Sequence, residues 1–213
     1  MDFQNNASVA QAARINGGRS VEFVTNVNRW AREGRLFTAS QGLEATDIPT
    51  VTTEAETTPI CSVQSPSAGI AVIPLRVYAA LTNDGGGLTT IDLAFTKAAA
   101  ACATALTLSG TTLNIQNHYT KNPQAGTQAT ALYTVTASAL LTSDYITLAH
   151  GHAADAALTT GLIQINEVFD YEFTFPLMLV ESAALLLYGY TASGAGNIAV
   201  SITWAEVPID ELV

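Results

Sequence analysis

Residues 184–191 read Ala-Leu-Leu-Leu-Tyr-Gly-Tyr-Thr, and residues 198–205 read Ile-Ala-Val-Ser-Ile-Thr-Trp-Ala. The second run alternates large apolar with small residues, as a strand with one buried face does, whereas the first run is apolar on both faces. Because the intervening turn contains Gly194 and Gly196, we predict a closing hairpin. The residues that we expect to contribute most to its core are Leu185, Leu187, Ile198, Val200, Ile202 and Trp204.

From residue 60 onward the pattern is β throughout, with short apolar runs separated by turns and no convincing long helix. Leu106–Gln116, for example, is typical of a hairpin that turns at Ser109-Gly110. Evenly spaced short strands without strand–helix alternation indicate an antiparallel sandwich or barrel. We therefore predict an all-β fold, an antiparallel β-sandwich of about eight strands.

Charge is scarce and unevenly spread. Charged residues make up 12% of the 213 residues, against about 25% in ordinary soluble domains. Such a surface resembles the charge-depleted centre of a protein interface, although a compact β-domain rich in Ala and Thr explains it too. The first 35 residues hold five arginines and three acidic residues, whereas the remainder holds three basic and fifteen acidic residues. The body should therefore repel nucleic acid and anionic membranes.

The first 59 residues are predicted to be an N-terminal arm and connector, and residues 60–213 the sandwich domain. Residues 20–37 fit helical and strand spacing equally well, and residues 38–59 are typical of an extended connector without a core of its own. We expect such a segment to stay mobile or to fold onto a neighbouring molecule. The arginines and aromatic anchors that we expect to make assembly contacts are Arg14, Arg19, Phe23, Arg29, Trp30, Arg32, Arg35 and Phe37.

The best candidate for a metal site is the stretch from His150 through His152 to Asp155, which we interpret as a loop. Zinc needs three or four protein ligands, and the third histidine, His118, lies far away in the sequence. We therefore expect a polar loop without a bound metal, and no cofactor elsewhere.

Two further sets of residues could carry chemistry. Asp170 and Glu172 are spaced for an acid/base pair, but they fit equally well as the solvated face of a strand. Cys61 and Cys102 could pair, although buried free thiols are favoured over a disulfide. No serine-hydrolase, zinc-protease or phosphate-loop motif is present, so we predict that the chain is not an enzyme.

The end of the chain resembles a known class of proteins. Phe-Pro-Leu-Met-Leu-Val (175–180), the two runs quoted above and the Glu-Val-Pro that follows them resemble the ending of jelly-roll structural proteins of tailless icosahedral viruses and phages. Residues 58–70 resemble the opening strand pair of the same class. The resemblance implies a single jelly roll of two four-stranded sheets, self-assembly into a shell, and an arm that runs under or between neighbours.

We therefore expect a capsid subunit whose partners are copies of itself and other virion proteins. The arm is far less basic than arms that package genomes, which leaves only weak contact with a genome or an internal membrane. Residues 1–20 lack the pattern of a secretory signal, and no run of eighteen apolar residues occurs, so we expect synthesis in the host cytoplasm and localisation in the virion. The alternative is a trimeric β-sandwich head that binds a receptor or a glycan.

Overall fold

The computed structural model describes residues 13–15, 21–23, 26–42, 46–53, 55–83, 88–119, 126–153, 166–192 and 196–212, most of which lie in strands. At residues 13–15, 21–23, 83, 152–153 and 166–168 it describes the backbone alone. The elements outside the two main sheets are the ribbon β1 (Ala13–Ile15) and β2 (Val21–Phe23), the helix α1 (Asn26–Arg32), and the 3-10 turns η1 (Ala99–Ala101) and η2 (Ile209–Glu211).

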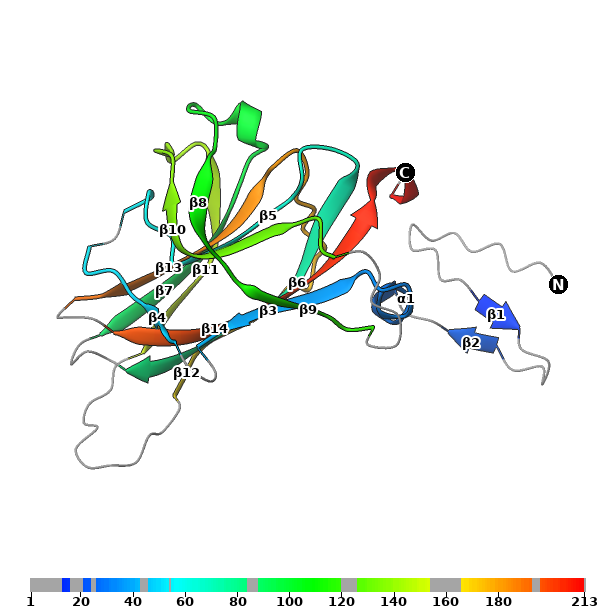
Figure 1. Ribbon diagram of the computed structural model, residues 1–213, viewed down its shortest axis with the longest axis horizontal. Coiled ribbons are helices and arrows are strands. Elements are labelled where there is room, and N and C mark those ends of the chain that lie inside the picture. Colours follow the sequence, from blue (N-terminus) through cyan, green and yellow to red (C-terminus); the bar gives the residue numbers. More distant parts are fainter. Residues whose placement is uncertain are drawn as a thin grey trace.

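The other strands form two antiparallel sheets (Figure 1). The β13 sheet has the order β11-β7-β13-β5-β10-β8, and the β14 sheet has the order β12-β6-β14-β3-β9, with β4 paired to the start of β14. The strands of the β13 sheet are β5 (Cys61–Gln64), β7 (Thr89–Thr96), β8 (Leu108–Thr112), β10 (Thr130–Ala137), β11 (Tyr145–Ala153) and β13 (Ala184–Thr191). Those of the β14 sheet are β3 (Leu36–Gln41), β4 (Ile48–Pro49), β6 (Ile70–Asn83), β9 (Asn114–Asn117), β12 (Asn166–Glu172) and β14 (Asn197–Pro208). The prediction of an all-β antiparallel sandwich is confirmed.

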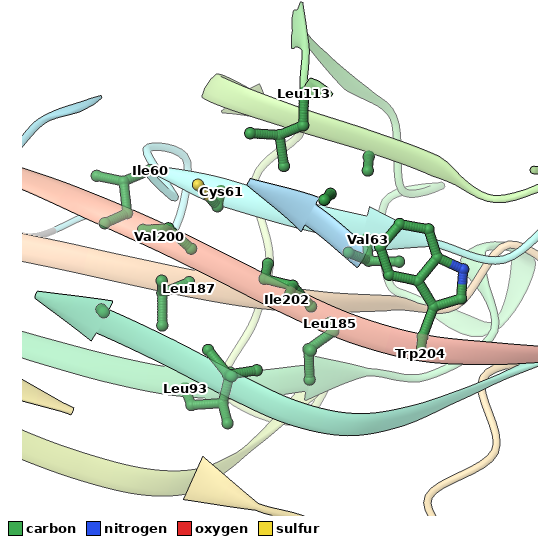
Figure 2. Packing of buried hydrophobic residues seen from close by; sticks show 14 of the residues in the cluster. Ile60, Cys61, Val63, Leu93, Leu113, Leu185, Leu187, Val200, Ile202 and Trp204 are labelled. Carbon is green, nitrogen blue, oxygen red and sulfur yellow. The ribbon is translucent and has the colours of Figure 1, made fainter. Parts of the chain in front are cut away.

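The core lies between the two sheets. Figure 2 shows Leu185 and Leu187 of β13 beside Val200 and Ile202 of β14, with Trp204 further along the same strand. All six residues predicted from the alternation are at most 1% exposed, so this prediction is confirmed. The small residues between them, such as Ser201, face outward, as the two-residue period of a strand requires.

The predicted closing hairpin is wrong. β13 pairs with β5 and β7, whereas β14 pairs with β3, β4 and β6 in the opposite sheet. Alternation identifies a buried face, but two strands that pack across a core show it as clearly as two that pair edge to edge. Between Thr191 and Asn197 the chain therefore passes from one sheet to the other.

β13 is covered on both faces, as its composition predicts. Its outward side chains, among them Leu186 and Tyr188, lie in a second apolar cluster under residues 97–107 and 138–144. The buried carboxylate of Asp144 joins the two covering segments, because it accepts hydrogen bonds from the backbone N–H groups of Leu141 at 3.0 Å and Ala103 at 3.2 Å. The bond from Leu141 lowers the pKa of Asp144, which favours the charged, accepting form.

The hairpin predicted to turn at Ser109-Gly110 is also wrong. Both residues lie inside β8, and the chain runs on past the buried Leu113 into β9, which belongs to the other sheet. A Cβ atom on Gly110 would lie 2.8 Å from the carbonyl oxygen of Tyr133 in β10. Glycine is therefore needed here for the close approach of two strands and not for a turn.

The sandwich begins earlier than the predicted boundary at residue 60. β3 and β4 both pair with β14, although we expected a connector without a core. Phe37 is 4% exposed and stacks on Trp204 with their ring centroids 6.0 Å apart, and Ile48 is fully buried. Residues 20–37, whose spacing fits both a helix and a strand, contain β2, α1 and the start of β3. Strand and helix spacing occur in consecutive segments of this stretch.

We predict that Trp204→Ala lowers the free energy of unfolding by about 3–5 kcal/mol, because it leaves a cavity at the centre of the core. Urea unfolding of the parent and the variant measures this. Ile146→Ala is the control, since Ile146 is 59% exposed and its truncation should change stability by less than about 0.5 kcal/mol. Equal losses in the two variants would contradict the placement of Trp204 in the core.

Candidate functional site: the N-terminal junction

The N-terminal segment joins the sandwich through α1, residues 33–35 and η2, which we call the N-terminal junction (Figure 1). Arg29 and Glu33 form an i,i+4 ion pair at 2.8 Å, and basic residues occupy the last turn of α1, where the helix dipole favours them. Gly34 ends the helix with a φ of +72°, a conformation that glycine adopts without strain. The chain then enters β3 directly.

α1 covers one end of the outer face of the β14 sheet. Trp30 and Ala31 pack on a small apolar cluster at this end. The buried members of the cluster are Leu36, Ile73, Ala205 and Val207. The helix is therefore held by apolar contacts with three strands of its own chain.

Glu211 of the C-terminal turn ties the junction together. Its carboxylate accepts hydrogen bonds from both terminal nitrogens of Arg35, at 2.7 and 2.8 Å, and from Arg29 at 3.3 Å. Bidentate arginine–carboxylate pairs are among the stronger charged contacts in proteins. The hydrogen bond from Arg35 lowers the pKa of Glu211, and the same bond raises the pKa of Arg35.

The eight residues predicted to make assembly contacts lie in different parts of the structure. Arg29, Trp30 and Arg35 meet at the junction, and Phe37 lies in the core, so these four contact their own chain. Arg32 is exposed on α1. The backbones of Arg14 and Phe23 lie in β1 and β2, and Arg19 lies outside the described residues.

The candidate metal residues are not brought together in the described part of the chain. His150 and His152 lie in β11 and not in a loop, and Asp155 falls outside the described residues. The ring of His150 contacts the carboxylate of Asp92 on the neighbouring strand β7. His118 lies 2.6 Å from the hydroxyl of Thr38. No three His, Cys, Asp or Glu side chains among the described residues lie close enough to hold a metal.

Asp170, one of the two candidate acid/base residues, forms an ion pair with Arg76. Its carboxylate accepts hydrogen bonds from Arg76 at 2.7 and 2.5 Å. The bond from Arg76 lowers the pKa of Asp170, which makes this carboxylate a weaker base. Asp170 and Glu172 are both exposed, whereas Phe169, which precedes Asp170 in β12, is buried in the core. The two carboxylates therefore lie on the solvated face of the strand.

The two cysteines are buried and unpaired, so the favoured alternative is confirmed. Cys61 lies in the core between the sheets, and Cys102 lies in the outer cluster beneath residues 97–107. Burial raises the pKa of both thiols, which keeps them protonated and poorly reactive at neutral pH.

The sequence did not predict the buried carboxylate of Glu206. It accepts hydrogen bonds from the indole N–H of Trp204 at 3.1 Å, from the backbone N–H groups of Gln128 and Ala129 at 2.9 and 3.1 Å, and from the hydroxyl of Thr127. Glu206 follows Trp204 by two residues in β14, so the alternation of the strand places its side chain on the buried face. An acidic residue at a position expected to be buried could therefore have been noticed in the sequence. Together with Arg35 it lines a shallow groove of about 540 Å³ beside the junction.

No protein-family model matches the chain, and no curated protein sequence matches it. The described helices are all too short or too polar to cross a membrane.

We predict that Glu211→Gln lowers the melting temperature by about 1–3 °C at pH 7, because it weakens a partly exposed ion pair. The folded pKa of Glu211 lies below its unfolded value of about 4.3. The pair therefore stabilises the fold above that pH, and this contribution is lost as the pH falls through the folded pKa. Thermal melts from pH 7 to about pH 3 should show the difference between parent and variant shrinking towards zero.

Glu172→Gln serves as the control, since Glu172 is exposed on β12 and is not one of the carboxylates that pair with Arg29 or Arg35. A difference between parent and Glu211→Gln that stays constant from neutral to acidic pH would show that the ion pair is not its cause.

Proposed function

We propose that the chain is a self-assembling capsid subunit of an icosahedral virus or phage, built on a single jelly roll. The pairing of its strands carries this proposal. Eight strands remain when the ribbon, β4 and the inserted strands β8 to β10 are set aside: β3, β5, β6, β7, β11, β12, β13 and β14. Among them the first pairs with the last, the second with the seventh, the third with the sixth and the fourth with the fifth.

This nested pairing supports a jelly roll, in which two Greek keys give two four-stranded sheets. The corresponding sheets would be β12-β6-β14-β3 and β11-β7-β13-β5. The inserted strands add to one side of both sheets, since β10 pairs with β5 and β9 pairs with β3. An insertion between the fourth and fifth strands therefore leaves the nested pairing intact.

Jelly rolls also occur in lectins and cupins, so the fold alone does not select a capsid. The interior favours a structural role, because Leu93, Leu187 and Trp204 and their neighbours fill the space between the sheets with apolar side chains. The low charge of the chain favours broad contacts with other protein subunits. These features together support self-assembly over catalysis.

The N-terminal segment supports an assembly arm. Among the described strands, β1 and β2 pair with each other alone and stand beyond α1, away from the two sheets (Figure 1). An isolated two-stranded ribbon is at best marginally stable in water, so it needs a surface to pack on. We propose that residues 1–25 form this arm and that α1 anchors it to the sandwich. Residues 1–25 hold two arginines and two acidic residues, so this arm has no net charge, and any contact with a genome or an internal membrane would be weak.

A pocket of about 180 Å³ favours a second candidate function, a trimeric head that binds a glycan. It lies on the outer face of the β13 sheet, between two tyrosines and two carboxylates. The residues that line it include Glu56, Asp92, Tyr145, Thr147 and Tyr188. Aromatic faces and carboxylate acceptors are a combination that can hold a sugar ring.

Sedimentation velocity and negative-stain imaging of the purified chain test the two functions. A capsid subunit forms large closed particles, whereas a receptor-binding head forms discrete trimers that bind glycans on an array. Discrete trimers without particles would contradict the capsid proposal.

We predict that deletion of residues 1–25 leaves a folded domain that no longer forms normal particles. The deletion stops at residue 25 because Leu36 and Phe37 belong to the core, and α1 covers the apolar cluster of the junction. Light scattering and imaging measure assembly, and a thermal melt like that of the parent shows that the fold is intact. Normal particles from the truncated chain would rule out the arm as an assembly element.

A further inference from the structure

Exposed apolar side chains gather at one end of the sandwich. Seven large apolar residues are exposed in the described part of the chain: Val27, Leu88, Leu141, Ile146, Phe175, Met178 and Leu212. The strand registers and connecting hydrogen bonds place all but Leu88 at the end that carries α1 and the C-terminal turn. Clustered exposed apolar residues mark contact surfaces more often than scattered ones do.

Phe175 is the most exposed of these, at 84%, and Met178 is 54% exposed. Both lie in the connection between β12 and β13, which runs along the first part of β6. The backbone N–H of Phe173 donates to the carbonyl of Leu75 at 3.0 Å, and Leu179 and Val72 exchange two hydrogen bonds of 2.9 Å. The backbone on both sides of Phe175 and Met178 is therefore fixed, and their exposure is a feature of the folded chain.

α1 borders the same part of β6. Trp30 packs on the cluster that contains Ile73 and Leu75, and Val27, one helical turn earlier, is 41% exposed. Val27, Phe175 and Met178 thus come from two elements that flank residues 72–75, and we call them the β6 patch. Phenylalanine and methionine are enriched in protein interfaces relative to the rest of the surface.

The ribbon of β1 and β2 is an apolar segment without a surface of its own. Ile15, Val21 and Phe23 lie in it, and only residues 24 and 25 separate β2 from α1. It pairs with neither sheet of its own chain (Figure 1). It therefore leaves the sandwich beside the β6 patch without adding a strand to the sheets there.

The described ribbon has no net charge, because Arg14 of β1 lies opposite Glu22 of β2. The end that holds the β6 patch exposes charges of both signs, Glu172 and Asp210 together with Arg32 and Arg76. Contact between ribbon and patch would therefore depend on apolar side chains.

We propose that the β6 patch is the docking site for the β1–β2 ribbon of a second copy of this chain. This rests on the proposed assembly function and names the two surfaces that meet. Ribbon and patch are different surfaces, so each copy offers one of each, and the contact is head-to-tail. Head-to-tail contacts close into rings when the rotation between copies allows it, which is what a shell requires.

The first experiment compares Phe175→Ser/Met178→Ser with Leu88→Ser, which removes an exposed apolar residue at the opposite end. The double variant should fold normally, as judged by its thermal melt, and should need about tenfold or more protein to assemble. Leu88→Ser should assemble like the parent, and Phe175→Trp should retain assembly. Particles of the parent together with unchanged assembly of the double variant would overturn the docking site and leave the assembly function standing.

The second experiment tests the identity of the occupant. Chains that carry Ile15→Cys are mixed with differently tagged chains that carry Met178→Cys, and interchain disulfides are measured under mild oxidation. The buried Cys61 and Cys102 do not compete. Disulfides between the two tags are expected, and a Leu88→Cys chain in place of Met178→Cys should give at least about tenfold fewer.

Disulfides that form only within one chain carrying both substitutions would show that the ribbon folds back on its own patch, and would overturn the proposal. Interchain disulfides from a parent that forms only small oligomers would support the docking site and contradict the capsid function.

Discussion

The packing of Trp204 is the contact on which the rest of the structure depends. Its ring is fully buried, stacks on Phe37 of β3 and donates its N–H to Glu206. The carboxylate of Glu206 in turn holds the backbone of Gln128 and Ala129, just before β10. One indole therefore links the first strand of the sandwich, the last strand and the inserted segment. An unpaired carboxylate at this depth would be costly, so the donors around Glu206 are as necessary as the ring itself.

The two outer faces of the sandwich differ in how far the chain covers them. The β13 sheet is covered by its own chain, through residues 97–107 and 138–144, which Asp144 ties together. Among the described residues, α1 is what covers the outer face of the β14 sheet, and it does so at one end. Further along, this face bears hydroxyl groups such as those of Thr38 and Thr203, which bond to each other at 2.8 Å, and the Arg76–Asp170 pair. Hydroxyl groups make this face polar in a chain in which only 12% of residues are charged.

The sequence predicted the class of fold and much of the core, because alternation at Ile198–Trp204 reports directly on which face of a strand is buried. It did not predict the partners of the strands. Side-chain period is the same for a neighbour in the sheet and for a strand across the core, which is why β13 and β14 were paired wrongly. Gly110 was read as a turn for a similar reason, since close strand approach and tight turns both select glycine. At the candidate site, the sequence identified Arg29, Trp30 and Arg35 but not Glu211, because an ion pair across 176 residues leaves no local pattern.

The junction also has a consequence for the order in which the chain folds. β3 pairs with β14, and Arg35 pairs with Glu211, so the contacts that seat α1 join residues at opposite ends of the sequence. Contacts of such high sequence separation form late in folding, since the intervening chain must be ordered first. During synthesis, moreover, they cannot form until residues up to 211 have left the ribosome. A truncated or half-folded chain therefore lacks a seated α1, so the position of the β1–β2 ribbon beyond the sandwich depends on completion of the fold.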